Sequence, residues 1–151
     1  MDLKENDLAP DFQLPADDGT TVRLSELRGQ RVVLYFYPRA DTPGCTTESC
    51  EFRDLTPSIE AKGAVIYGIS PDTVSAVRKF REKFGFPFHL LADADHRVAE
   101  EYGVWTEKSM FGRKYMGVER STFVIAADGT IERAYRQVDP AGHAETVLRE
   151  L

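Results

Sequence analysis

The feature that most constrains the fold is a pair of apolar runs, RVVLYFY at residues 31–37 and AVIYGIS at residues 64–70, with a helical pattern between them. Nearly every position in both runs is apolar, and many residues are β-branched or aromatic, which is typical of strands buried on both faces. The stretch from Pro43 to about Gly63 predicts a helix, with a bend or break near Pro57 because proline lacks the N–H of a helix interior. A strand, a helix and a second strand in this order predict parallel strands joined by a crossover.

The rest of the chain continues the alternation of strand and helix signals. Before the first buried strand, the turn signal Asp17-Asp18-Gly19 lies between two short extended runs and predicts an N-terminal β-hairpin arm. Asp128-Gly129 is a two-residue turn signal that predicts a closing hairpin over residues 121–136. The other predicted elements are a helix that starts at the signal Ser70-Pro71-Asp72 and runs to about residue 84, a strand within residues 86–93, a short helix within residues 93–103 and a terminal helix within residues 141–151.

This order of elements predicts one α/β domain over residues 1–151, with a mixed central β-sheet flanked by helices on both faces. Such an arrangement is thioredoxin-like. In open sheets of this type, ligands bind outside the carboxyl ends of the strands. The segment from Tyr37-Pro38 to Cys45 follows a predicted strand at such an end, so a functional site is expected there.

Composition limits the classes of function. The chain has 151 residues, of which 42% are hydrophobic and 29% charged, as expected of a globular domain that needs no disulfide for stability. Its net charge of −6 and its lack of a basic cluster predict no nucleic-acid partner. No stretch approaches the ~18 apolar residues of a membrane span, so no membrane partner is expected. The first ten residues lack the apolar core of a secretory signal, and we therefore expect a cytoplasmic protein whose thiols are kept reduced.

The two cysteines of the chain, Cys45 and Cys50, follow a Thr-Pro-Gly sequence. Thr42 suits the N-cap of a helix and Pro43 its first position, so Cys45 is expected at about the third helical residue. Unpaired amide groups and the helix dipole favour an anion at that position, which here would be a thiolate, the reactive form of cysteine. Cys50 lies deeper in the helix and receives less of this field. Cys45 is therefore the better candidate nucleophile, and Cys50 a candidate second thiol.

Helix geometry bears on what this pair of cysteines can do. Cys50 is expected about 140° around the helix from Cys45, with the two Cα atoms ~8.7 Å apart. A disulfide requires a Cα separation below about 7 Å, so a permanent structural bridge is disfavoured. A zinc site is also disfavoured, because His89, His96 and His143 show no ligand spacing. A reversible redox pair and a pair of inert core thiols both remain open on this reasoning.

The segment YFYPRADTPGCTTESCEFRD, residues 35–54, resembles the active-site segment of the peroxiredoxins, specifically the Q-type group, also called bacterioferritin comigratory proteins. The pattern P-x-x-x-T-x-x-C of that family is matched by Pro38, Thr42 and Cys45, and its resolving cysteine, five positions further on, by Cys50. The resemblance covers almost the whole chain, because it continues through residues 105–125 and 142–151.

The resemblance implies a thiol peroxidase that reduces hydrogen peroxide and organic hydroperoxides and uses neither a cofactor nor a metal ion. Cys45 would attack a peroxide oxygen and become a sulfenic acid, and Cys50 would then form an intramolecular disulfide with it. Thr42 would bond the thiolate or the peroxide, and Pro38 would shield the site from water. Arg120 would stabilise the thiolate and the charge that shifts along the O–O bond. Thioredoxin or a similar dithiol donor would reduce the disulfide again, and the protein is expected to be a monomer.

Several residues near these motifs allow more than one interpretation. From the residues alone nothing links Arg120 to Cys45, and Arg120 could equally be a solvated arginine at the end of a strand. Glu48 could hold local structure or be a charge on the helix surface. A loosely apolar segment lies between a predicted helix and a predicted strand; its members are Trp105, Met110, Phe111, Tyr115 and Met116. These residues are expected to pack over the sheet edge. A peroxide-access rim or a reductase-docking surface is the weaker alternative. No histidine is given a catalytic role.

Two other classes of function remain as alternatives. A thioredoxin-like disulfide oxidoreductase would ordinarily carry C-x-x-C, whereas this chain has four residues between its cysteines. A non-enzymatic redox sensor would record oxidation in the same pair without rapid turnover of peroxide.

Overall fold

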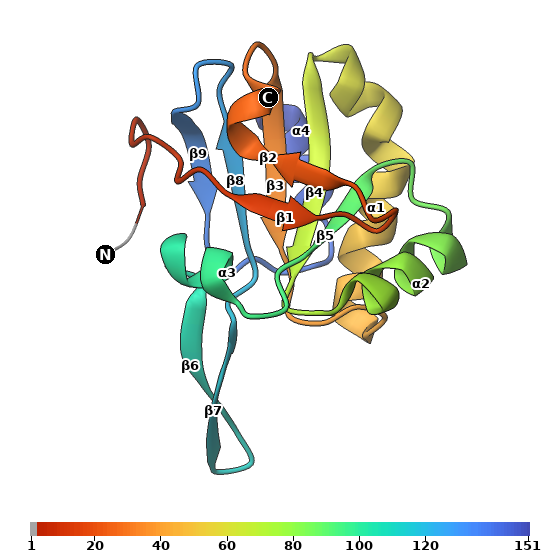
Figure 1. Cartoon of the computed structure of the whole chain (residues 1–151), viewed down its shortest axis with the longest axis vertical. Helices are drawn as coiled ribbons and strands as arrows, with labels where there is room; N and C mark the ends of the chain where they lie inside the picture. Colours follow the sequence, from red (N-terminus) through yellow and green to blue (C-terminus); the bar gives the residue numbers. More distant parts are fainter. Residues whose placement is uncertain (1–2) are drawn as a thin grey trace.

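A computed structural model describes residues 3–151 of the chain. Its central sheet has five strands in the order β5-β4-β3-β8-β9 (Figure 1). The strands β3 (Arg31–Phe36), β4 (Ala64–Ser70) and β5 (His89–Ala92) are parallel. The strand β8 (Ser121–Ile125) is antiparallel to β3, and β9 (Ile131–Tyr135) is antiparallel to β8. The mixed sheet predicted from the sequence is confirmed.

Helices cover both faces of this sheet, as expected of a thioredoxin-like fold. One face packs against α1 (Pro43–Ala61), α2 (Val74–Phe84) and α4 (His143–Glu150). The other face is covered by α3 (Arg97–Glu101) together with the N-terminal arm (Figure 1). That arm consists of β1 (Gln13–Pro15), β2 (Thr21–Arg23) and the short 3-10 helix η1 (Leu24–Leu27).

The strand β3 is the centre of the core. All residues from Val32 to Tyr37 are buried, with alternate side chains entering the two layers of the core. Tyr35 stacks on Phe52 of α1 with ring centroids 4.7 Å apart, which fixes the helix that carries both cysteines against the sheet. Burying a large apolar side chain contributes about 1.5–3 kcal/mol to the free energy of folding. The buried side chains of β3 therefore stabilise the packing of the sheet against α1.

Two boundaries of the helices differ from those expected. The helix α1 continues through Pro57 without the predicted break. The helix α2 begins at Val74, after Thr73, whose hydroxyl accepts a hydrogen bond from the amide of Ala76 at 3.2 Å. The predicted start at residues 70–72 was wrong because Ser70 is the last residue of β4 and the carboxylate of Asp72 accepts from the amide of Ala40 at 2.8 Å instead of capping a helix.

A second, separate hairpin was not predicted. The strands β6 (Trp105–Met110) and β7 (Arg113–Val118) pair with each other and project away from the body of the molecule (Figure 1). Of the residues expected to pack over the sheet edge, only Trp105 packs against the core, where it is partly buried. For the rest the expectation was wrong, because they lie exposed on the projecting hairpin: Met110, Phe111, Tyr115 and Met116. Its turn, Phe111-Gly112, lacks the usual Asn-Gly or Asp-Gly signal.

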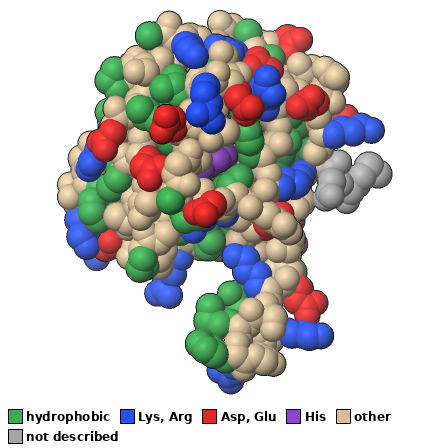
Figure 2. Space-filling model, turned by 180° about the vertical axis from the view of Figure 1, so that it is seen from behind, with side chains coloured by type: hydrophobic (Ala, Val, Ile, Leu, Met, Phe, Trp, Pro, Cys, Tyr) green, Lys and Arg blue, Asp and Glu red, His purple; other side chains and the backbone are tan. Residues whose placement is uncertain are grey.

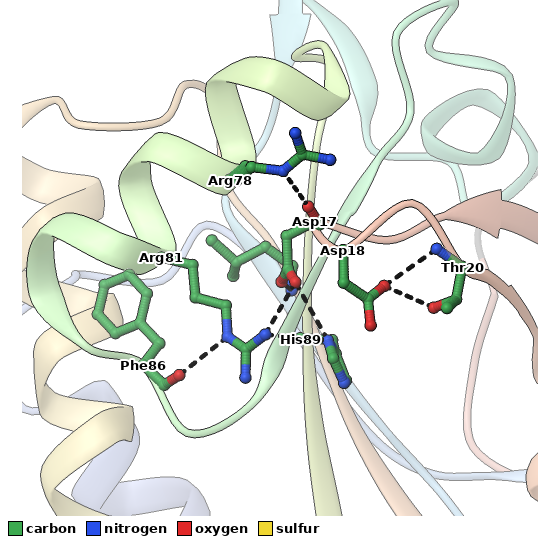
Figure 3. A network of polar contacts seen from close by, with 8 residues as sticks. Asp17, Asp18, Thr20, Arg78, Arg81, Phe86 and His89 are labelled. Atoms are coloured by element: carbon green, nitrogen blue, oxygen red, sulfur yellow. Dashed lines mark hydrogen bonds and ion pairs between the residues drawn. The ribbon is translucent and has the colours of Figure 1, made fainter.

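The carboxylate of Asp17 ties the N-terminal arm to α2 and β5 (Figure 3). It is buried, and it accepts from Arg81 Nη1 at 2.9 Å and from the amide of Leu90 at 2.7 Å. His89 Nδ1 lies 3.2 Å from the same carboxylate, and Arg78 donates to the backbone carbonyl of Asp17 at 2.8 Å. One side chain thus joins three elements that are distant in the sequence.

Replacing Asp17 by alanine is expected to lower the free energy of unfolding by about 3 kcal/mol, because Arg81 and a buried amide lose their acceptor together. Chemical denaturation measures this loss. The matched control is Asp18→Ala, since Asp18 is exposed and bonds only Thr20 among the described residues. Equal, small losses in the two variants would contradict the role assigned to Asp17.

Candidate active site

Cys45 lies at the amino end of α1, where the sequence predicted it. Pro43 is the first residue of the helix, and Thr42 occupies the N-cap position with an extended backbone. The Cys45 side chain is only 1% exposed, so its sulfur is shielded from bulk water. Unpaired amides at this end of the helix favour the thiolate form of a cysteine.

Thr42 differs in detail from its expected role as a cap. Its side chain makes no capping hydrogen bond with the helix, and its hydroxyl donates to the carbonyl of Arg39 at 2.8 Å. This bond orders the loop before α1. A contact of Thr42 with the thiolate or with a bound peroxide stays a prediction.

Arg120 meets Cys45, although the two residues are far apart in the chain. Its Nη2 donates to the sulfur of Cys45 at 3.3 Å, and its Nη1 donates to Glu48 Oε1 at 2.8 Å. The pairing of β3 with β8 explains this meeting, since Ser121 lies opposite Phe36 and so places Arg120 beside the loop that leads into α1. Arg120 is therefore not the solvated arginine that the residues alone had left open.

Gly44 is a residue of the site that the sequence interpretation missed. A Cβ atom at this position would lie 3.2 Å from Arg120 Nη2, tighter than an ordinary contact. The absence of a side chain lets the guanidinium approach the amino end of α1 closely. Only the fold shows this, because nothing in the sequence connects Gly44 with Arg120.

Glu48 is buried, so it is not a charge on the helix surface. Its Oε1 accepts from Arg120, while its Oε2 has no hydrogen-bond partner among residues 3–151. Burial raises the pKa of this carboxyl to about 7, although the positive charge of Arg120 acts in the opposite direction. Glu48 thus orients Arg120 and changes its own charge near neutral pH.

The raised pKa of Glu48 predicts a pH dependence of stability. Between its usual pKa of 4.5 and about 7, the carboxyl ionises in the unfolded chain while it stays protonated in the folded one. Ionisation therefore favours unfolding. The stability that comes from keeping this carboxyl protonated in the fold is present below pH 4.5 and is lost as pH rises to about 7. Relative to Glu48→Gln, the wild type should lose roughly 1–3 kcal/mol of unfolding free energy over that window.

Denaturation curves across this pH range test the expectation. The control is Glu60→Gln, which changes an exposed carboxyl on the same helix. Wild-type and Glu48→Gln curves that stay parallel from low to neutral pH would show that Glu48 does not titrate there.

Cys50 lies on the same unbroken helix as Cys45, and neither cysteine is in a disulfide. It is partly buried, and burial raises the pKa of its thiol. Burial therefore disfavours the thiolate form of Cys50 while the helix is closed. The α-helical offset of about 140° keeps the two sulfurs on different faces of α1.

Pro38 and Arg39, in the loop before Cys45, form one wall of a cleft of about 830 Å³. The opposite wall is the β6–β7 hairpin, which includes Trp105 and Tyr115. Pro38 is half-buried, and its proposed shielding of the thiolate stays a prediction.

The sequence profile of the AhpC/TSA family matches residues 6–134, which include both cysteines, Arg120 and the whole of the central sheet except the last residue of β9. The chain belongs to the AhpC/TSA family. It is 46% identical to peroxiredoxin Bcp of Bacillus subtilis over 100% of this chain and 96% of that protein. It is 44% identical to the putative peroxiredoxin bcp of Coxiella burnetii over the full length of both.

Solved structures of family members agree with these relationships. A peroxiredoxin Q of Xylella fastidiosa matches this fold with a TM-score of 0.94 and 37% identity, over 99% of this chain and 96% of that one. The bacterioferritin comigratory protein of Xanthomonas campestris, studied for its alkyl peroxide reduction activity, matches with a TM-score of 0.88 and 40% identity, over 92% of this chain and 88% of that one. The chain is thus a peroxiredoxin of the Bcp and Q group, an enzyme with thiol-dependent peroxidase activity.

Proposed function

We propose that Cys45 is the peroxidatic cysteine and that the contact between Arg120 and its sulfur is what makes it reactive. The Cys45 thiolate attacks one oxygen of the peroxide and breaks the O–O bond. The sulfur becomes a sulfenic acid, and the other oxygen leaves as water or an alcohol after taking up a proton. Arg120 stabilises the negative charge that moves from the sulfur to the leaving oxygen.

Cys50 is the resolving cysteine in this proposal. Its thiol attacks the sulfur of the sulfenic acid, a disulfide forms between Cys45 and Cys50, and water is released. An external dithiol, thioredoxin or a similar donor, then reduces the disulfide and is itself oxidised. Thr42 and Pro38 complete the site by bonding the peroxide and by excluding water.

The substrates in this proposal are hydrogen peroxide and organic hydroperoxides. The open cleft beside Pro38 and Arg39 leaves space for an organic group. The alkyl peroxide activity of the Xanthomonas campestris relative supports the same range. We further propose a cytoplasmic monomer that binds no nucleic acid, in keeping with a net charge of −6.

Peroxide consumption by the purified protein tests the proposed function. Hydrogen peroxide and an alkyl hydroperoxide are each supplied with thioredoxin, with glutaredoxin or with a small dithiol, and the loss of peroxide is followed. Rapid turnover with a dithiol donor is expected. Slow, single-equivalent oxidation with every donor would instead indicate a redox sensor.

Replacing Arg120 by methionine is expected to slow the reaction of Cys45 with peroxide about a hundredfold, the usual loss when one charge-stabilising donor is removed. Stopped-flow oxidation measures this rate, and alkylation of Cys45 as a function of pH reports the fraction of thiolate. Arg97→Met, which removes an exposed arginine, serves as the control. An unchanged rate together with an unchanged alkylation profile would remove Arg120 from the mechanism.

A further inference from the structure

The tip of the β6–β7 hairpin exposes apolar side chains that the fold does not use. Phe111 is 97% exposed, and Met110 and Met116 are 54% and 50% exposed. Figure 2 shows the hairpin projecting from the body, with hydrophobic side chains gathered along one side of it. The strand register places Met110 and Met116 on opposite faces of the hairpin, on either side of Phe111 at the turn. Exposed apolar side chains gathered on a projecting element favour a contact surface.

The turn itself argues that Phe111 serves such a contact. Phe111 and Gly112 both have positive φ, 52° and 78°, as in a type I′ turn. Asparagine, aspartate or glycine is favoured at the first of these positions, and a bulky residue there is unusual. Phe111 therefore costs stability in the turn and gains no burial within the monomer. This combination favours a contact of Phe111 with an apolar partner.

Charge indicates the chemistry of that partner. The cleft beside the hairpin is lined by four cationic residues, and no Asp or Glu among residues 3–151 lines it. Lys108 lies on its inner side, where burial and then the nearby charge of Arg120 lower its pKa. Arg113 and Lys114 are exposed near the tip, where Lys114 pairs only loosely with Glu107 at 3.7 Å. A positive hairpin on a chain of net charge −6 favours an anionic partner.

A lipid surface fits this combination better than a second copy of the chain. Two hairpins meeting across an interface would bring Arg113 and Lys114 of both copies together, and like charges oppose such docking. A bilayer needs no complementary pocket for a projecting tip, and it offers an apolar layer beneath negative headgroups. We propose that the β6–β7 hairpin docks onto anionic lipid surfaces, with Phe111 and its methionine neighbours among the acyl chains and the basic side chains against the headgroups.

This attachment would be peripheral. No helix within residues 3–151 combines the length and the apolar character that crossing a bilayer requires. The sequence-based expectation of no membrane partner considered spanning segments alone, and the proposed docking departs from it. Because Pro38 and Arg39 line the same cleft as the hairpin, docking would bring the loop that precedes Cys45 close to the lipid.

Co-sedimentation with vesicles tests the proposal, without peroxide or reductant, so the result is independent of the peroxidase function. The full chain is mixed with vesicles of phosphatidylcholine alone, or of equal parts phosphatidylcholine and phosphatidylglycerol. Binding is expected only to the anionic vesicles and should weaken as salt is raised. Phe111→Asn should weaken it about tenfold, since the burial of one phenylalanine is lost.

Phe111→Asn is a useful variant because Asn-Gly is a preferred type I′ pair, so the hairpin should be at least as stable as in the parent. Leu8→Asn is the matched control, because Leu8 is an exposed apolar residue outside the hairpin, at 64%. Lys114→Ser should weaken binding, whereas Lys79→Ser on α2 should not.

Three outcomes would overturn the proposal. The first is no binding of the parent to anionic vesicles, and the second is equal binding by the parent and Phe111→Asn. The third is a dimer in analytical ultracentrifugation that Phe111→Asn dissociates, which would assign the hairpin to a contact between copies.

Discussion

Replacing Cys45 by serine is expected to reduce peroxide consumption to background, a loss of at least about a thousandfold. A serine hydroxyl stays protonated at neutral pH, so the helix end and Arg120 have no thiolate to stabilise. The substitution changes one atom in a side chain that is 1% exposed, and the fold should tolerate it. Continuous assays with a dithiol donor measure the loss.

The matched variant for this experiment is Cys50→Ser, which keeps the nucleophile and removes the other thiol of the chain. One equivalent of peroxide should still react with it and leave a sulfenic acid, which a sulfenate-selective reagent traps at Cys45. Cys45→Ser should give no such product. Substantial turnover in Cys45→Ser, or trapping at Cys50 in that variant, would reverse the roles assigned to the two cysteines.

The sequence predicted those parts of the fold whose signals are local. The runs at residues 31–37 and 64–70 are apolar at almost every position, and both form buried strands. The turns at Gly19 and Gly129 have positive φ, 85° and 92°, as glycine in a hairpin turn allows. The β6–β7 hairpin was missed because Phe111 occupies the turn position where a small polar residue gives the usual signal.

In the candidate site, too, the sequence predicted the features that depend on neighbouring residues and not those that depend on strand pairing. The position of Cys45 in the helix follows from Thr42 and Pro43, which are its neighbours in the chain. The contact with Arg120 depends on the pairing of β3 with β8, which no spacing within the sequence specifies. For this reason the residues alone left Arg120 open, and the resemblance to peroxiredoxins was needed to name it. Neither the residues alone nor the resemblance identified Gly44. Its role depends on the missing side chain, which lets Arg120 approach the amino end of α1.

Replacing Cys50 by serine is expected to stop turnover with thioredoxin at the sulfenic acid, before the first cycle is complete, and the reason lies in the geometry of α1. Both cysteines lie on one unbroken helix, where their Cα atoms are ~8.7 Å apart and a disulfide requires less than about 7 Å. The disulfide can form only if the first turns of α1 open. Cys50→Ser cannot form it, so its sulfenic acid should persist, and its helix should stay closed after treatment with peroxide.

Amide hydrogen exchange separates these two states. In the oxidised wild type, exchange should accelerate across residues 42–54, while the buried strand β3 stays protected. Peroxide-treated Cys50→Ser provides the control, because it carries the oxidised sulfur without the cross-link. Equal protection in the reduced and disulfide forms of the wild type, with the disulfide confirmed by mass, would mean that closure needs no opening of α1. In that case the helix geometry would not limit the second step of the cycle, and stabilising the first turns of α1 would not prolong the sulfenic acid.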